Sequence, residues 1–160
     1  MTQEQNKTTE RPVKQEGFAW ISPTMVTRDA ERALSFYEKA LGFTIEKNLQ
    51  NAQGKTLFAQ MSYKGMTFML EPKEFLDADS LKESPVESGH FPPIGFYIYC
   101  EDLEETYKRA LEHGAKSYLK PEDAFWGDRI AKIIDPDGYL WGLAKHTHDF
   151  DPSKMPPSWQ

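Results

Sequence analysis

The feature that most constrains the fold of this sequence is a spacing of 73 residues that occurs twice. An aspartate placed to cap a helix occurs at Asp29 and again at Asp102, and a glycine before a strand-like run occurs at Gly65 and again at Gly138. Because these two landmarks are independent, their equal spacing indicates a duplicated unit. Each copy has the order strand, helix and three strands, which predicts two βαβββ modules.

The first module is predicted to cover residues 18–72. Its helix begins after Asp29 and ends at Gly42, the usual C′ glycine. Apolar residues recur at helical spacing on one side of it, which predicts a buried stripe of Ala30, Ala33, Leu34, Tyr37 and Leu41. The strands are expected at Phe18–Val26, Phe43–Leu49, Thr56–Met61 and Met66–Glu71, and Pro23 marks an edge or a bulge.

The second module is predicted to cover residues 93–146. Asp102 caps its helix, Glu105 completes a capping box, and the helix runs to His113. The strands are expected at Ile94–Cys100, Ala115–Tyr118, Asp128–Ile134 and Tyr139–Lys145, and a turn over Asp135–Gly138 joins the last two.

Length and composition favour one domain built from both modules. The chain has 160 residues, of which 39% are hydrophobic, enough for a packed core that neither half could form alone. We therefore expect an α+β domain in which the modules form one eight-stranded curved sheet, or cup, with the helices outside. Residues 1–17 are expected to be a flexible tail, residues 73–92 a linker and residues 147–160 a C-terminal arm.

Charge and cysteine content narrow the possible partners. The net charge of −6 without a basic run argues against nucleic acid and against an anionic membrane surface. The single cysteine, Cys100, excludes an internal disulfide and a cysteine-based zinc site. The polar start and the lack of a long apolar stretch predict no signal peptide and no membrane span, so a cytoplasmic protein is expected.

Three segments carry a resemblance to a known family. The first helix, Asp29–Phe43 (DAERALSFYEKALGF), and the last hairpin, Asp135–Trp141 (DPDGYLW), resemble the vicinal oxygen chelate superfamily. The run Phe125–Arg129 (FWGDR) resembles its glyoxalase/bleomycin-resistance-like group. This superfamily includes glyoxalase I, extradiol dioxygenases, fosfomycin-resistance transferases and bleomycin-resistance proteins. The resemblance covers residues 18–146 and specifies a fold more than a reaction.

The resemblance also implies where a metal would bind. In that superfamily the first and fourth strands of each module supply the ligands, typically His, Gln or Glu. The corresponding positions in this sequence are Ser22, Met69, Gly95 and Gly142. None of these residues is a usual ligand of a divalent cation, so we expect neither a metal nor another cofactor. This pattern is closest to the metal-free, bleomycin-resistance-like members, which bind a small molecule without transforming it.

Strand alternation predicts the lining of the cup. Tyr97 and Tyr99 share the face of Gly95, whereas Cys100 is expected to face the helices. Aromatic rings, small residues and one acid suit a flat or cationic organic ligand, and the two glycines leave space for its atoms. Three residues of the run FWGDR are added to these. The expected ligand-binding residues are then Trp20, Ser22, Thr24, Met69, Glu71, Gly95, Tyr97, Tyr99, Phe125, Trp126, Arg129 and Gly142.

Several alternatives stay open from the sequence. The aromatic residues could fill the core, and Arg129 could pair with a nearby acid. A metal-dependent lyase, isomerase or dioxygenase of the glyoxalase type would need Glu71, His90 or His146 in the cup, and a metal-free enzyme could use Glu71 as a general base. Because many relatives complete their ligand site across a dimer interface, the resemblance also implies a homodimer.

Overall fold

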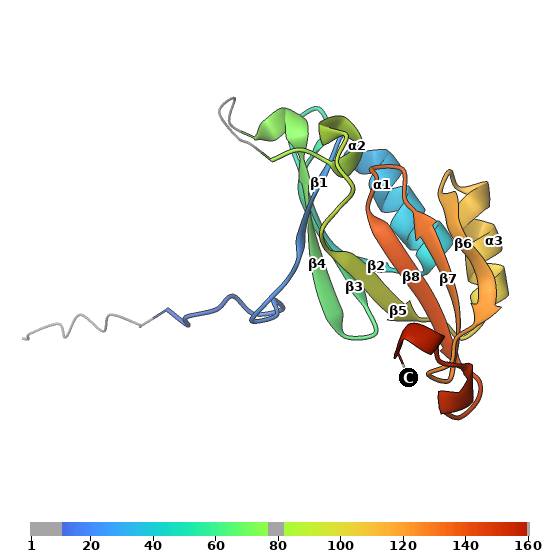
Figure 1. The fold of residues 1–160 in the computed structure, drawn as a ribbon. Coiled ribbons are helices and arrows are strands. Elements are labelled where there is room, and N and C mark those ends of the chain that lie inside the picture. Colours follow the sequence, from blue (N-terminus) through green and yellow to red (C-terminus); the bar gives the residue numbers. More distant parts are fainter. Residues whose placement is uncertain (1–10, 77–81, 160) are drawn as a thin grey trace, which may run out of the picture.

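The eight expected strands are present, and they form two four-stranded sheets (Figure 1). The computed structural model describes residues 11–76 and 82–159, so residues 1–10 of the expected tail and 77–81 of the expected linker lie outside it. The strands are β1 (Thr24–Thr27), β2 (Thr44–Gln50), β3 (Thr56–Tyr63), β4 (Met66–Pro72), β5 (Gly95–Tyr99), β6 (Lys116–Asp123), β7 (Asp128–Ile134) and β8 (Leu140–His146). The α-helices are α1 (Ala30–Phe36), α2 (Pro85–Ser88) and α3 (Leu103–Glu112); the other helical turns are η1 (Tyr37–Leu41), η2 (Lys73–Phe75), η3 (Pro152–Lys154) and η4 (Pro157–Trp159).

The two sheets repeat one topology, which confirms the α+β class and the two βαβββ modules. The strand orders are β1-β4-β3-β2 and β5-β8-β7-β6, with the first pair of each sheet parallel and the others antiparallel. Within the described residues no backbone ladder connects the sheets, so the eight strands do not form one continuous sheet.

Tyrosine hydroxyls from the opposite module cover the free edges of β1 and β5. The Tyr139 hydroxyl donates to the carbonyl of Val26 (3.1 Å) and accepts from its N–H (2.9 Å). The Tyr63 hydroxyl donates to the carbonyl of Tyr99 at 2.6 Å. These bonds satisfy backbone groups that a neighbouring strand would otherwise pair, and they explain how two separate sheets can lie edge to edge.

The first strand is shorter than the sequence predicts. It begins at Thr24 rather than at Phe18, directly after Pro23, which has no N–H to donate to a ladder. The helix that follows begins as expected, because the Asp29 side chain accepts from the N–H of Arg32, and it ends at Gly42 with φ 77°. Its last turn, η1, is π-helical.

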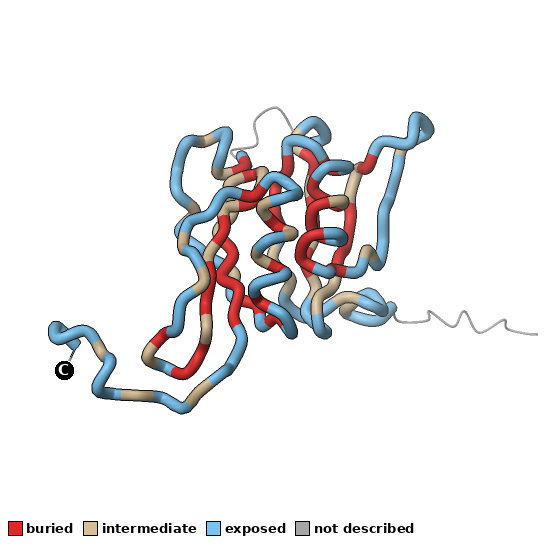
Figure 2. The backbone as a smooth tube through the Cα atoms, turned by 90° about the vertical axis from the view of Figure 1, so that its right-hand side faces the viewer, coloured by how far each residue is buried: buried red, intermediate tan, exposed pale blue. Residues whose placement is uncertain are grey.

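One core joins the two modules on the helix side of both sheets. Helix α1 packs against β4, α3 packs against β6, β7 and β8, and η1, which continues α1, packs against α3. Trp141 at the centre is completely buried and packs against the rings of Tyr37, Phe43, Phe68 and Phe96. Cys100 is buried in the same core, as predicted. Figure 2 shows buried positions in the central strands and helices, and exposed ones along the connections and the C-terminal arm.

The face of each sheet opposite this core carries most of the residues predicted for the cup. We call these surfaces the first and second open faces, for the sheets of the first and second module. No helix in the described residues is long and apolar enough to cross a bilayer.

A buried carboxylate ties the last hairpin to the first helix. Asp135 is 4% exposed and accepts hydrogen bonds from the Tyr37 hydroxyl (2.7 Å), the Trp141 indole (2.9 Å) and the N–H groups of Asp137 and Tyr139. Burial raises the pKa of Asp135 to about 6, and nearby Asp137 adds to this effect, although the hydrogen bonds favour the ionised form.

We expect Asp135 to make stability depend on pH. Its pKa is higher in the folded than in the unfolded chain, so its contribution is complete below about pH 4 and is lost as the pH rises through about 6. A shift of this size corresponds to about 3 kcal/mol. In urea unfolding, the stability advantage of the natural protein over Asp135→Asn should shrink by up to that amount between these two pH values. A difference that is constant with pH would contradict this.

Candidate functional site

The second open face is built around a buried carboxylate that the sequence analysis did not single out. Asp128, the first residue of β7, is 3% exposed. Its Oδ2 accepts from the hydroxyls of Tyr97 (2.8 Å) and Tyr99 (2.9 Å), and its Oδ1 lies 3.1 Å from Nδ1 of His146. We call these four residues the Asp128 cluster.

Strand register explains why these residues meet. Tyr97 and Tyr99 are two residues apart on β5, so both side chains lie on one face. Asp128 and His146 are directly opposite each other at the ends of β7 and β8. A cross-strand pair in a hairpin can be recognised in the sequence only when the register of the two strands is known.

The cluster keeps a negative charge beneath the aromatic surface. Burial opposes ionisation of Asp128, but the hydrogen bonds from Tyr97, Tyr99, His146 and Trp126 lower its pKa below the usual value. Burial, with the bond to Asp128, raises the pKa of Tyr97 to about 12, and the bond to Asp128 raises that of Tyr99. Both phenols therefore stay protonated at neutral pH and donate to an ionised carboxylate.

This arrangement decides what the surface offers a ligand. The hydroxyl protons of Tyr97 and Tyr99 are both used by Asp128, so their oxygens can only accept a further hydrogen bond. The two rings are 46% and 56% exposed. The face thus presents lone pairs and π surfaces above an anion, a combination that favours a cation or a hydrogen-bond donor.

An aromatic wall extends from the cluster onto the C-terminal arm. The Trp126 indole N–H points at the Tyr97 hydroxyl at 3.4 Å, and the ring lies 5.1 Å from that of Phe125. Phe125 also contacts Phe150 and Trp159 of the arm, at 6.1 and 5.7 Å between ring centroids. The predicted loop residues and the arm therefore form one side of the second open face.

The first open face is partly covered by the chain itself. Gly17 accepts a hydrogen bond from the Gln60 side chain at 2.8 Å, and Phe18 stacks on Phe58. Lys47 lies 4.3 Å above the Phe18 ring. The segment before β1 therefore lies across part of this face and buries Gln60.

The predicted residues of the first module lie on or beside this face. Thr24 is opposite Met69 in the β1–β4 register, and the Ser22 hydroxyl bonds to that of Thr67. Glu71, at the end of β4, pairs with Lys82 at 2.9 Å. Trp20 is 78% exposed, with the Lys14 ammonium 5.8 Å from its ring.

The predicted residues of the second module divide into two groups. Gly95, Tyr97, Tyr99 and Gly142 lie on the second open face, whereas Arg129 forms ion pairs with Glu104 and Asp123, the alternative left open above. The free space expected at Gly142 is not there, because a Cβ atom at this position would lie only 2.8 Å from the Tyr97 ring. Two cavities lie between the modules. The predicted residues that line one of them, Ser22 and Thr24, come only from the first module. Those that line the other, Gly95, Tyr97 and Tyr99, come only from the second module.

The residues at the superfamily's metal positions do not fit a divalent cation. Gly95 and Gly142 have no side-chain donor, Met69 offers only a thioether, and the Ser22 hydroxyl is already bonded. His146 and Asp128 are bonded to each other, and Glu71 to Lys82. In the described part of the chain no three His, Cys, Asp or Glu side chains are grouped to hold a metal.

Comparisons with known proteins agree with this fold. The family model described as Glyoxalase/Bleomycin resistance protein/Dioxygenase superfamily matches residues 17–143. The uncharacterized protein Mb0911c of Mycobacterium bovis is 30% identical over 129 residues, which are 81% of this chain and 84% of that protein. The uncharacterized protein Rv0887c of Mycobacterium tuberculosis has the same identity over the same length, 75% of its own chain.

Two solved structures share the architecture. TioX from Micromonospora sp. ML1 superposes with a TM-score of 0.61 at 20% identity, over 81% of this chain and 99% of its own. A gene product of Arabidopsis thaliana gives 0.63 at 20% identity, over 80% and 99% of the two chains. At these identities the likeness concerns the fold alone.

Proposed function

The chain belongs to the glyoxalase/bleomycin resistance protein/dioxygenase superfamily, and on that premise we propose that it binds a flat, cationic organic molecule on its second open face. The observation that carries the proposal is the Asp128 carboxylate, ionised and buried beneath the half-exposed rings of Tyr97, Tyr99 and Trp126.

A cation gains from this surface in two ways. The ring faces attract it through their quadrupoles, and the ionised carboxylate below them adds a charge of opposite sign. An anion meets the opposite field. A neutral flat molecule gains only from stacking, so the charge of the ligand should decide its affinity.

Binding of this kind requires no metal and no catalytic group. The hydrogen bonds within the Asp128 cluster hold the carboxylate in place and orient the tyrosine rings. To sequester a ligand, the surface needs only to be complementary to it in shape and charge. We therefore propose a binding protein rather than a glyoxalase-type enzyme.

We further propose that a second copy of the chain completes the site. Each open face leaves a large apolar side chain exposed, Leu49 of the first sheet at 58% and Tyr99 of the second at 56%. Apolar patches on a sheet face are typical of interfaces. A homodimer that placed a partner's first open face over the second would cover both, and sedimentation equilibrium should show a dimer; a monomer at all concentrations would contradict it.

The ligand class is tested with two matched probes. N-methylquinolinium is flat and cationic, and quinoline has the same ring system but is uncharged at neutral pH. By calorimetric titration the cation should bind at least about tenfold more tightly, as expected for about 1.4 kcal/mol of cation–π and charge interaction. In Asp128→Asn this preference should disappear.

The control is Asp123→Asn, which removes an exposed carboxylate of β6 that pairs with Arg129 outside the cluster. It should bind both probes like the natural protein. Equal affinities for the two probes, or an equal loss in both variants, would exclude the second open face as a cation site.

A further inference from the structure

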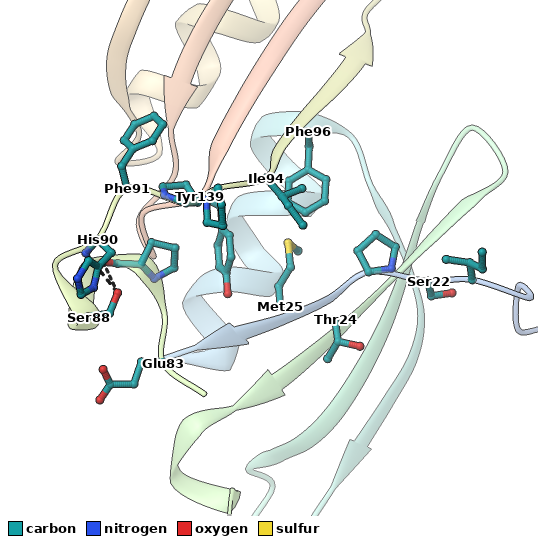
Figure 3. Close-up of a pocket in the computed structure, with 15 residues that line it drawn as sticks. Ser22, Thr24, Met25, Glu83, Ser88, His90, Phe91, Ile94, Phe96 and Tyr139 are labelled. Atoms are coloured by element: carbon teal, nitrogen blue, oxygen red, sulfur yellow. Dashed lines mark hydrogen bonds between the residues drawn. The ribbon is translucent and has the colours of Figure 1, made fainter. Parts of the chain in front are cut away.

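A cavity of about 500 Å³ lies between the two modules, away from the Asp128 cluster (Figure 3). One wall is the chain from Ile21 to Met25, and the other is the segment 83–94 that leads into β5. Figure 3 shows Met25, Phe96 and Tyr139 projecting into it. None of the residues of the Asp128 cluster lines this cavity, and its volume is within the range of small-molecule sites.

The wall formed by segment 83–94 is anchored to the last hairpin. Val86 of α2 donates its N–H to the carbonyl of Asp137 at 3.0 Å. Gly138 approaches so closely that a Cβ atom there would lie 2.8 Å from the Val86 nitrogen. Ser84 is completely buried and forms a capping box with Glu87. The cavity is therefore built on a packed support.

The polar side chains that line the cavity are largely bonded to other protein groups. The Ser88 hydroxyl donates to the carbonyl of Pro85, and Glu83 pairs with Lys73 at 3.1 Å. The Tyr139 hydroxyl bonds to Val26, as described above. Most of the remaining lining is apolar, so the cavity favours a neutral molecule with a large apolar surface.

One backbone donor and acceptor pair faces the cavity. In the parallel ladder Pro23 accepts from the N–H of Met69, so residues 23, 25 and 27 bond to β4 while Thr24 and Val26 point their N–H and C=O groups to the free edge. Tyr139, which lines the cavity, occupies that edge at Val26. In the described residues no other strand pairs with the free edge of β1. The backbone N–H and C=O of Thr24 are therefore available to a ligand.

We propose that this cavity is a second ligand site, which takes a neutral, mainly apolar ring compound with adjacent N–H and C=O groups, such as a lactam. The ligand accepts from the N–H of Thr24 and donates to its carbonyl, and the rings of Phe96 and Tyr139 contact its apolar part. A peptide strand fits less well, because it would also need the groups of Val26, which Tyr139 occupies.

The mouth of the cavity supports an occupant of this chemistry. Ile21, Phe91 and Ile94 are 84%, 56% and 69% exposed. An apolar ligand in the cavity would cover part of this surface, which is a gain for binding.

The experiment uses 2-quinolone and its N-methyl derivative, which has the same rings but no N–H. Binding is followed by calorimetry and by amide chemical shifts. 2-Quinolone should bind with saturation, shift the Thr24 amide and lose at least about tenfold in affinity on N-methylation, the loss expected for an unmade buried hydrogen bond.

Two variants distinguish the contribution of the Thr24 backbone from that of its side chain. Thr24→Pro removes the edge N–H without touching the β4 ladder, a change that edge strands tolerate, and it should weaken 2-quinolone about as much as N-methylation does. Thr24→Val keeps the backbone pair and should bind normally, because the Thr24 side chain points away from the cavity (Figure 3).

Three outcomes would overturn the proposal: no saturable binding, equal binding of the N-methyl derivative, or equal binding to Thr24→Pro. Coverage of the mouth by a second copy would appear as absence of binding in the dimer. Asp128→Asn should leave 2-quinolone unaffected, so this proposal and the cation site fail or succeed separately.

Discussion

Trp141→Ala is expected to lower the free energy of unfolding by about 3–5 kcal/mol, the usual range for removing a fully buried large aromatic side chain. Trp141 is 0% exposed, and its ring stacks on Phe96 with 4.6 Å between centroids. It also contacts Phe43 and Phe68 of the first module. Removal of this ring would therefore weaken the packing between the two modules as well as the packing within the second one.

The loss is measured by urea unfolding, with Trp126→Ala as the matched control. Trp126 is 42% exposed, so its removal should cost far less. If Trp141→Ala does not fold, Trp141→Phe tests the same contact. It keeps an aromatic ring but removes the N–H that bonds to Asp135, and should cost about 1–3 kcal/mol. A loss for Trp141→Ala no larger than that for Trp126→Ala would show that the modules do not depend on this residue.

Gly142→Ala is expected to disrupt the proposed cation site, although it adds only one methyl group. That methyl would lie 2.8 Å from Cδ2 of Tyr97 and 3.5 Å from the carbonyl of Phe96. The ring must move, and its hydroxyl then leaves Asp128. Overpacking of this kind costs about 1–3 kcal/mol, so affinity for N-methylquinolinium should fall by roughly 5-fold to 150-fold.

Gly95→Ala is the internal control, since Gly95 lies on the same open face, on β5 opposite Leu140 of β8. The nearest atom to a Cβ there is the flexible Cδ2 of Leu140 at 3.4 Å. Affinity should stay within about twofold of the natural protein, because a side-chain end can move at little cost. Equal effects of the two substitutions would contradict the role given to Tyr97.

Much of the fold follows from local sequence patterns. The 73-residue spacing predicts two modules, and helix caps at Asp29 and Asp102 lie where the sequence places them. Alternation in β5 correctly separates Cys100, which faces the core, from Tyr97 and Tyr99, which do not. These features depend on the periodicity of the sequence and on the chemistry of single residues, both of which are set by residues close together in the chain.

The candidate site could be predicted only in part. Tyr97, Tyr99 and Trp126 are found because alternation and loop composition point to them. Asp128 is missed, although it follows Trp126 in the motif FWGDR. Its importance comes from a cross-strand pair with His146 and from the hydroxyls of Tyr97 and Tyr99 on a third strand. Such contacts depend on register, which a bulge or a proline can shift by one residue and so move a side chain to the other face.

The sequence by itself determined the module, its repetition and the side-chain alternation of β5, because these follow from backbone geometry over a few residues. Only the tertiary structure decided that the modules join through their helix sides around Trp141, that Tyr63 and Tyr139 occupy the free edges of β5 and β1, and that the Tyr97 ring fills the space above Gly142. These outcomes depend on side chains far apart in the chain competing for the same volume and the same hydrogen bonds, which local patterns do not encode.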